Sequence, residues 1–328
     1  MPLEVRTPVL LASLLGPAAL ALVGCAASGT RGAEATGPFV EYDFVAWAQE
    51  RSAPLARADA FDGVPARLLS ADPTTGRFAG VLQVPAGYGR AAGGALPVTT
   101  EFYVLEGTLQ FGAERLEARD YAFVPPGVDP PALASTSGAR VLLFHSPSVA
   151  DADALAKQRA QGAYVTRDRD ARWSPGTVSQ AAGVNVPLEI KHLRKDPHSG
   201  ARTWLVRIAP GTKVPWERHS TVEEGFLLEG DYRLSECLRS GSRTGDYAPG
   251  GYFHRPAGVL HSGPESGTRR GAVWLMRSPG TLDVQFYTEC RDGRGEGPMG
   301  APPVAPAAAP DATPRPDAPT AAPAPPAP

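Results

Sequence analysis

The fold is decided by the stretch Gly211-Thr-Lys-Val-Pro-Trp-Glu-Arg-His-Ser-Thr-Val-Glu-Glu-Gly-Phe-Leu-Leu-Glu-Gly230. Glu217 and His219 are two residues apart, so on an extended strand both side chains point to the same face. Glu223 follows after a polar break, at the start of an apolar run that is typical of the next strand. The spacing therefore predicts two consecutive strands that carry polar side chains where they meet.

A second stretch lies further along the chain and reads Gly250-Gly-Tyr-Phe-His-Arg-Pro-Ala-Gly-Val-Leu-His261. Its Pro256-Ala-Gly258 segment marks a tight turn. Such a turn can direct His261 back toward the first pair of strands.

At these residues the chain resembles the cupin superfamily. The first cupin motif is G-x5-H-x-H-x3-E-x6-G, and this chain matches it except that Glu217 stands where the first His is expected. The second motif is G-x5-P-x-G-x2-H-x3-N, and the chain matches it except that Glu265 replaces the final Asn. The matching positions are Gly211, His219, Glu223, Gly230, Gly250, Pro256, Gly258 and His261. The resemblance implies a small antiparallel β-barrel that holds a metal at its mouth.

The resemblance also implies a ligand set, which here is Glu217, His219, Glu223 and His261. Imidazole and carboxylate donors together suit a divalent first-row metal. The additional carboxylate favours Mn or Fe over Zn or Ni. The alternative interpretation is a barrel whose site has decayed, with its polar residues merely lining a cavity.

The N-terminus predicts export and lipid anchoring. Residues 8–23 form an uncharged apolar run after Arg6, with the length of a signal-peptide core and too short for an ordinary membrane-spanning helix. Leu22-Val-Gly-Cys25 resembles the bacterial lipobox, which implies a signal peptide over 1–24, lipidation of Cys25 and a tether over 25–37. Ala26 favours the periplasmic face of the outer membrane. The alternatives are a true membrane anchor and a signal peptide in which Cys25 occurs by chance.

Two further cysteines, Cys237 and Cys290, follow in the second half of the chain. An oxidising periplasm permits them to pair. The sequence leaves open whether they do, because spacing alone does not establish connectivity.

The chain contains an internal repeat, which predicts tandem domains over 38–160 and 161–290. Four segments of the first half recur in order in the second. The matches are 84–87 with 208–211, 101–107 with 224–230, 121–127 with 252–258, and 141–147 with 273–279. The whole chain thus resembles a bicupin.

The first copy lacks the ligands of the second. Thr100 and Pro130 occupy the positions of Glu223 and His261, so no imidazole or carboxylate converges there. Glu101 is one residue out of register, which sends it to the other face of its strand. We therefore expect the first barrel to be structural or to bind an uncharged ligand, and His145 to be a histidine at the edge of its core.

Other segments predict little chemistry. A short helix is expected near residues 151–160, and the Pro- and Ala-rich residues 291–328 are expected to be disordered. His192 and His198 are interpreted as solvated loop residues. The formal net charge of −2 gives no indication of nucleic-acid binding.

The fold class predicted is therefore all-β, with two tandem cupin barrels. Fold alone leaves the function open. Residues 193–211 and 245–261 resemble the cupin domain of anti-sigma factors that sense singlet oxygen, although the whole chain resembles bicupins without an assigned activity. The favoured hypothesis is a metal-dependent enzyme of the oxygenase or isomerase type acting on a small organic molecule, with Glu224 or His254 beside the metal ligands as the base. The alternatives are a non-catalytic ligand-binding or sensing module and a scaffold. Whether the chain is an enzyme stays open, and a homodimer is allowed.

Overall fold

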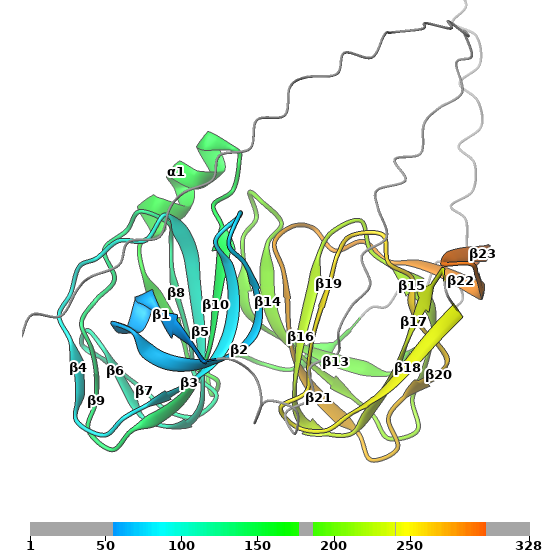
Figure 1. Cartoon of the computed structure of the whole chain (residues 1–328), viewed down its shortest axis with the longest axis horizontal. Coiled ribbons are helices and arrows are strands. Elements are labelled where there is room, and N and C mark those ends of the chain that lie inside the picture. Colours follow the sequence, from blue (N-terminus) through cyan, green and yellow to red (C-terminus); the bar gives the residue numbers. More distant parts are fainter. Residues whose placement is uncertain (1–54, 177–185, 240, 300–328) are drawn as a thin grey trace, which may run out of the picture. The chain divides into compact units, whose positions relative to one another are not determined.

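The computed structural model describes residues 55–176, 186–239 and 241–299, and nearly all of the regular secondary structure of these residues is β-strand (Figure 1). Antiparallel pairing joins the strands into four sheets, two in each half of the described chain. The predicted signal peptide, Cys25 and the tether lie outside the described residues.

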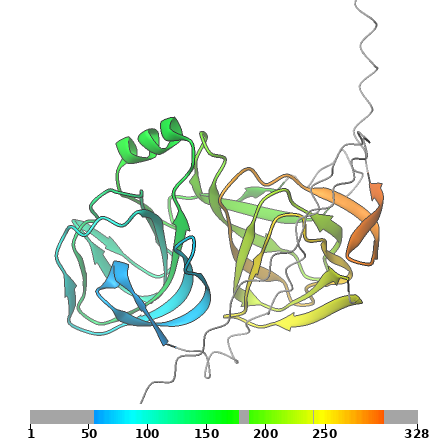
Figure 2. The ribbon, with the colours of Figure 1, turned by 45° about the horizontal axis from the view of Figure 1, so that its top comes forward.

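The first half builds one barrel from two sheets (Figure 2). The larger sheet has the order β1 (Leu55–Ala58), β2 (Val64–Asp72), β3 (Arg77–Val84), β10 (Ala139–Pro147), β5 (Val98–Gly107), β8 (Tyr121–Val124) and β11 (Tyr164–Thr166). The smaller sheet has the order β4 (Tyr88–Arg90), β9 (Leu133–Ser135), β6 (Leu109–Phe111) and β7 (Glu114–Leu116). Because β11 pairs with β8, this barrel continues beyond the expected boundary at residue 160.

The second half builds another barrel of the same kind. One sheet has the order β12 (Ser174–Pro175), β13 (Leu188–Lys195), β14 (Arg202–Ile208), β21 (Ala272–Ser278), β16 (Glu223–Gly230) and β19 (Tyr252–Arg255). The other has the order β18 (Gly241–Tyr247), β17 (Tyr232–Leu238), β20 (His261–Gly267), β15 (Lys213–Arg218), β22 (Gln285–Arg291) and β23 (Arg294–Met299).

The sheet orders agree with the repeat found in the sequence. In the first barrel the larger sheet contains β2-β3-β10-β5-β8, and the second barrel repeats it as β13-β14-β21-β16-β19. The smaller sheet β4-β9-β6-β7 recurs as β15-β20-β17-β18. The two halves therefore share one topology, as the four matching segments predict.

The interiors of the two barrels differ. In the first, Phe61, Phe102 and Phe111 pack edge-to-face, and the space left beside Thr100 and Pro130 measures only about 20 Å³. In the second, a cavity of about 430 Å³ remains. The first barrel is filled by its own side chains and has no room for an organic ligand among the described residues, which supports the structural role expected for it.

The two barrels belong to one compact unit, and their larger sheets share an apolar cluster. Phe144 and Tyr121 of the first barrel belong to this cluster together with Phe226 and Tyr252 of the second. Buried charges accompany it. Glu101 accepts hydrogen bonds from Tyr121 and from the Arg277 guanidinium at 2.6 and 2.8 Å, and Arg277 also donates to Glu224. Glu101 thus points away from its own barrel's interior, as its register predicts.

The helix expected near residues 151–160 is present as α1 (Ala152–Gln161). The side chain of Asp151 caps it by accepting a hydrogen bond from the backbone N–H of Ala154 at 2.8 Å, which satisfies one of the free donors of the first turn. No helix in the described part of the chain is apolar and long enough to cross a membrane.

The C-terminal boundary differs from the expectation. The chain does not lose its structure at residue 291, because β22 continues to Arg291 and pairs with β23 as far as Met299. A disulfide joins Cys237 of β17 to Cys290 of β22, with 5.9 Å between the Cα atoms. This bond settles the pairing that the sequence left open.

Candidate metal centre

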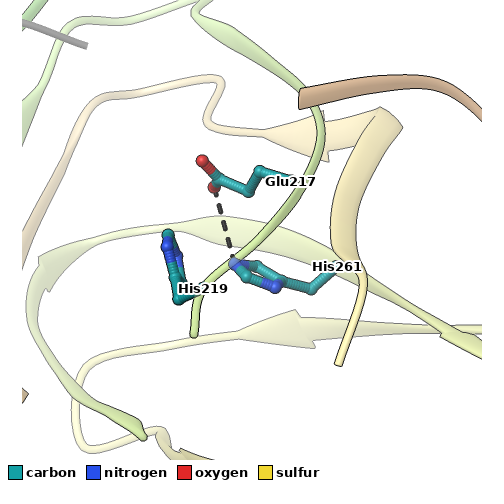
Figure 3. A group of neighbouring side chains, drawn as sticks. All are labelled: Glu217, His219 and His261. Atoms are coloured by element: carbon teal, nitrogen blue, oxygen red, sulfur yellow. Dashed lines mark ion pairs between the residues drawn. The ribbon is translucent and has the colours of Figure 1, made fainter. Parts of the chain in front are cut away.

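Three of the expected ligands converge at one end of the second barrel. Glu217 of β15 lies directly opposite His261 of β20 in the strand register, and His219 follows the end of β15. Their ligand atoms all lie within 4.8 Å of one another, and Oε1 of Glu217 lies 3.6 Å from Nε2 of His261. Figure 3 shows the carboxylate and the two rings gathered around a common space.

Backbone carbonyls fix the proton position on both imidazoles. Nδ1 of His219 lies 2.6 Å from the carbonyl oxygen of Asp283, and Nδ1 of His261 lies 3.0 Å from that of Val259. A carbonyl oxygen can only accept, so each Nδ1 carries the hydrogen. In the neutral ring Nε2 then offers its lone pair, which is the arrangement that metal-binding histidines use.

Burial shifts the pKa of two of the three groups, His261 and Glu217, in each case toward the uncharged form. Burial lowers the pKa of His261 well below its ordinary value, and the nearby charges of Arg255 and His219 lower it further. The ring of His261 is therefore neutral near pH 7. Burial raises the pKa of Glu217, and Glu223 adds to that rise, whereas His219 and a 3.0 Å hydrogen bond from Ser262 oppose it.

Glu223, the fourth expected ligand, lies beside the histidines but has another partner. Its Oε2 lies 3.6 Å from Nε2 of His219 and 3.7 Å from Nε2 of His261. The same oxygen accepts a hydrogen bond from the Arg255 guanidinium, which also donates to Glu236 at 2.9 Å. Only Glu217, His219 and His261 form a mutually close group among the described residues.

Sequence reasoning missed Arg255 and Glu236, both of which are fully buried. Alternation along β19 was the available signal. Phe253 and Arg255 line the cavity, whereas His254 points to the opposite face. As a histidine, His254 is the more conspicuous candidate ligand in the sequence, but the structure turns Arg255 toward the cavity.

The expectation that Glu224 or His254 lies beside the metal ligands is corrected for the same reason. Glu224 follows Glu223 on β16 and therefore faces the other side of the sheet. There it accepts hydrogen bonds from Tyr252, at 2.8 Å, and from Arg277. His254 lies opposite Glu224 on β19, and neither residue lines the cavity.

Two histidines and one tryptophan complete the comparison with the sequence. His192 is not a loop residue, because it lies on β13 and lines the cavity. His198 is exposed in the turn after β13, as expected. Trp216 faces away from the cavity and packs with Leu260, Tyr287 and the disulfide, as alternation beside Glu217 predicts.

The residues present fit a divalent transition metal. Two imidazole nitrogens with free lone pairs and one carboxylate make a borderline donor set that several such metals accept. Ligands on one ion with bonds of about 2.1 Å lie at most about 4.2 Å apart. Small side-chain adjustments therefore suffice to bring a group spread over 4.8 Å onto one ion.

Comparison with known proteins supports the fold. A family model described as a domain of unknown function (DUF4437) matches residues 46–285. The search among curated proteins found no match. Among solved structures, a Nostoc punctiforme protein described as a "putative dioxygenase" is 20% identical, with a TM-score of 0.58 over 75% of this chain and 87% of that one.

Oxalate decarboxylases are also among the similar structures. A mutant of the Bacillus subtilis enzyme is 13% identical, with a TM-score of 0.49 over 76% of this chain and 80% of its own. The Lactobacillus farciminis enzyme in its formate complex is 11% identical, with a TM-score of 0.49 over 76% and 89%. The likeness to the Nostoc punctiforme protein concerns the fold alone. Both barrels have the cupin fold, whereas the resemblance to anti-sigma factors and the lipoprotein signal remain predictions.

Proposed function

Because the chain belongs to the DUF4437 family, which is described only as a domain of unknown function, we propose its function from the site itself. We propose that the second barrel binds one divalent transition metal through Glu217, His219 and His261, with Mn or Fe favoured. The observation that carries this proposal is the pair of imidazoles whose Nδ1 atoms face backbone carbonyls, leaving both Nε2 lone pairs beside a carboxylate.

The cavity supports an enzyme acting on a small organic molecule. Its volume of about 430 Å³ lies within the range of small-molecule sites, and all three proposed ligands line it. A metal bound there supplies Lewis-acid or redox chemistry to a molecule held in the cavity. The protein would contribute a partly apolar wall that orients the ligand. We favour an oxygenase or isomerase type of reaction.

A non-catalytic ligand-binding or sensing module is the second candidate. The observation that favours it is the engagement of Glu223. Glu217 and Glu223 are the only carboxylates lining the described cavity, and Glu223 is held by Arg255. A free carboxylate that could act as a general base is therefore absent from the described lining. Turnover of any bound molecule would decide for the enzyme.

The location at the cell envelope is part of the proposal. It rests on the apolar run over 8–23 and on the lipobox-like residues ending at Cys25. A lipid at Cys25 would anchor the barrels to the periplasmic face of the outer membrane.

The metal proposal is tested by metal content. The full chain, purified without chelators or a His tag, is compared by inductively coupled plasma mass spectrometry with Glu217→Gln, His219→Ala and His261→Ala. His198→Ala serves as the control, because His198 is an exposed histidine outside the cavity. We expect near-stoichiometric Mn or Fe in the wild type and the control, and its loss in the three ligand variants. Equal metal content in all five proteins, or no metal in the wild type after Mn or Fe is supplied, would reject the site.

A further inference from the structure

One wall of the cavity carries three nitrogen-bearing side chains that form no ion pair with a described carboxylate. His192 and Lys195 lie on β13, and Arg202 begins β14. Lys195 and Arg202 are directly opposite one another in the antiparallel register, and all three residues line the cavity. Two like charges in such a cross-strand pair destabilise a sheet. An anion lying between them would reverse that effect.

Two polar atoms of this wall have no hydrogen-bond partner within the described protein. They are Nε of Arg202 and Nδ1 of His192, and both are buried. No described ion pair joins Arg202 or Lys195 to a carboxylate, although Glu223 interacts electrostatically with Arg202 from further away. Buried polar groups are ordinarily satisfied, so two unpaired groups on a cavity wall indicate a missing partner. Arg202 is also held in place, because its guanidinium stacks on the Trp204 ring at 4.2 Å.

The wall lies at the same level of the barrel as the metal centre. Arg202 pairs with Ser278 of β21, and the preceding residue of β21, Arg277, pairs with Glu224 of β16. Arg202 and Glu223 are therefore two strand spacings apart, which is roughly 10 Å between their backbones. A molecule of a few carbon atoms bridges such a distance.

Between the two polar ends the cavity is apolar and aromatic. Trp204, Phe253 and Trp274 line it, and each is almost completely buried. Most of a ligand's body would therefore contact ring faces and edges. An uncharged hydrocarbon would leave the cationic wall unpaired, and a purely polar ion would leave the aromatic surface uncovered.

We propose that the cavity binds a small organic carboxylate with an aromatic or branched apolar body. Its carboxylate lies against Arg202, Lys195 and His192. Its body lies against Trp204, Phe253 and Trp274, which directs the other end toward the metal centre. This deepens the proposed function by naming the class of substrate, and it rests on that function only for the role of the metal.

The test compares an acid with its neutral isostere. Isothermal titration calorimetry measures binding of 3-phenylpropionate and 3-phenylpropanamide to the full chain, both after chelator treatment and after loading with Mn. The variants are Arg202→Gln and Lys195→Gln. Arg207→Gln is the matched control, because Arg207 lies on the same strand but outside the cavity, where it pairs with Glu189. Lys195 is exposed, so its variant should fold even where Arg202→Gln does not.

We expect the acid to bind at least about tenfold more tightly than the amide, even without metal, because charge-assisted hydrogen bonds to carboxylate are the stronger kind. Arg202→Gln and Lys195→Gln should each reduce that preference, and Arg207→Gln should preserve it. Equal affinity for acid and amide, or no binding of either probe to either form, would overturn the proposal. Acid binding that requires Mn and is unchanged in both cavity variants would overturn it too, since the carboxylate would then sit on the metal. The titrations without metal test carboxylate binding even if the protein binds no metal. The metal site and the carboxylate site can therefore be rejected independently.

Discussion

At the scale of single residues, the metal centre depends on which partner each carboxylate has. Glu217 and Glu223 both lie within 3.7 Å of a histidine Nε2, yet only Glu223 is bound by a guanidinium. A carboxylate that accepts from a buried arginine is strongly held there. Motif spacing predicted both glutamates as metal ligands, but it carries no information on the position of Arg255. Its side chain reaches Glu223 only because alternation on β19 turns it inward.

This difference predicts unequal effects of two matched substitutions. Glu217→Gln should abolish metal retention, whereas Glu223→Gln should leave the metal content within about twofold of the wild type. Glu223→Gln should instead reduce the free energy of unfolding by about 1.5–3 kcal/mol, because it removes a charge-assisted hydrogen bond from Arg255. Metal content and urea unfolding, measured on both variants, check this expectation. Loss of metal from both variants would show that Glu223 is a ligand.

At the scale of elements, the order of the strands that carry the motifs was predictable, and two local details beside Glu217 were not. The motifs placed β15, β16, β19 and β20 in order, and the repeat predicted that the two halves share one fold. They gave no sign that Ser262 adopts a positive φ of 69°, which places its hydroxyl 3.0 Å from Glu217. They also did not show that Gly263 packs under Trp216, where a Cβ would lie 2.4 Å from the ring.

The pair β22–β23 also escaped prediction for a physical reason. Residues 294–299 contain Met299 as their only large apolar residue, so no periodicity marks them as a strand. Pairing with β22 supplies their hydrogen bonds, and β22 in turn pairs with β15, which carries Glu217. Cys290 of β22 is visible in the sequence, but only the three-dimensional structure shows that it is bonded to Cys237 of β17.

Removing that disulfide should therefore destabilise the edge of the barrel next to the metal centre. The two cysteines are 53 residues apart, and closing a loop of that length is worth roughly 4 kcal/mol through the entropy of the unfolded chain. We expect Cys237→Ser/Cys290→Ser to lower the free energy of unfolding by up to this amount. Urea unfolding of the double variant and of the wild type, each with and without reductant, measures it. Reductant should affect only the wild type, and equal stability of both oxidised proteins would contradict the expectation.

At the scale of the whole molecule, buried charges join the two halves of the chain. Burial by itself raises the pKa of Glu101, but the guanidinium groups of Arg277 and Arg194 outweigh it and hold the pKa at about 2. A carboxylate whose pKa is depressed in the folded state stabilises that state above its ordinary pKa of 4.5 and loses the contribution as the pH falls toward 2. The stabilisation by Glu101 is therefore lost between pH 4.5 and about pH 2.

The variant Glu101→Gln should reveal this contribution. It leaves the buried positive charges of Arg277 and Arg194 with less negative charge beside them. Such a loss typically lowers the free energy of unfolding by about 3–5 kcal/mol. The variant should also lose part of the wild type's decline in stability between pH 4.5 and pH 2. Urea unfolding over this pH range tests both effects. Glu106→Gln is the control, since Glu106 forms only an exposed pair with Arg140 and should change stability by less than about 1 kcal/mol. Equal losses in the two variants would argue against a special role of the buried pair.

The contrast between the filled first barrel and the hollow second one has a consequence for the duplicated architecture. Side chains in a filled core gain dispersion contacts that the walls of a cavity do not make. The second barrel, with its cavity of about 430 Å³, therefore gains less stability from core packing than the filled first barrel. In a tandem duplication, the filled copy can stabilise the chain through its packed core, while the other copy keeps an open cavity for a ligand.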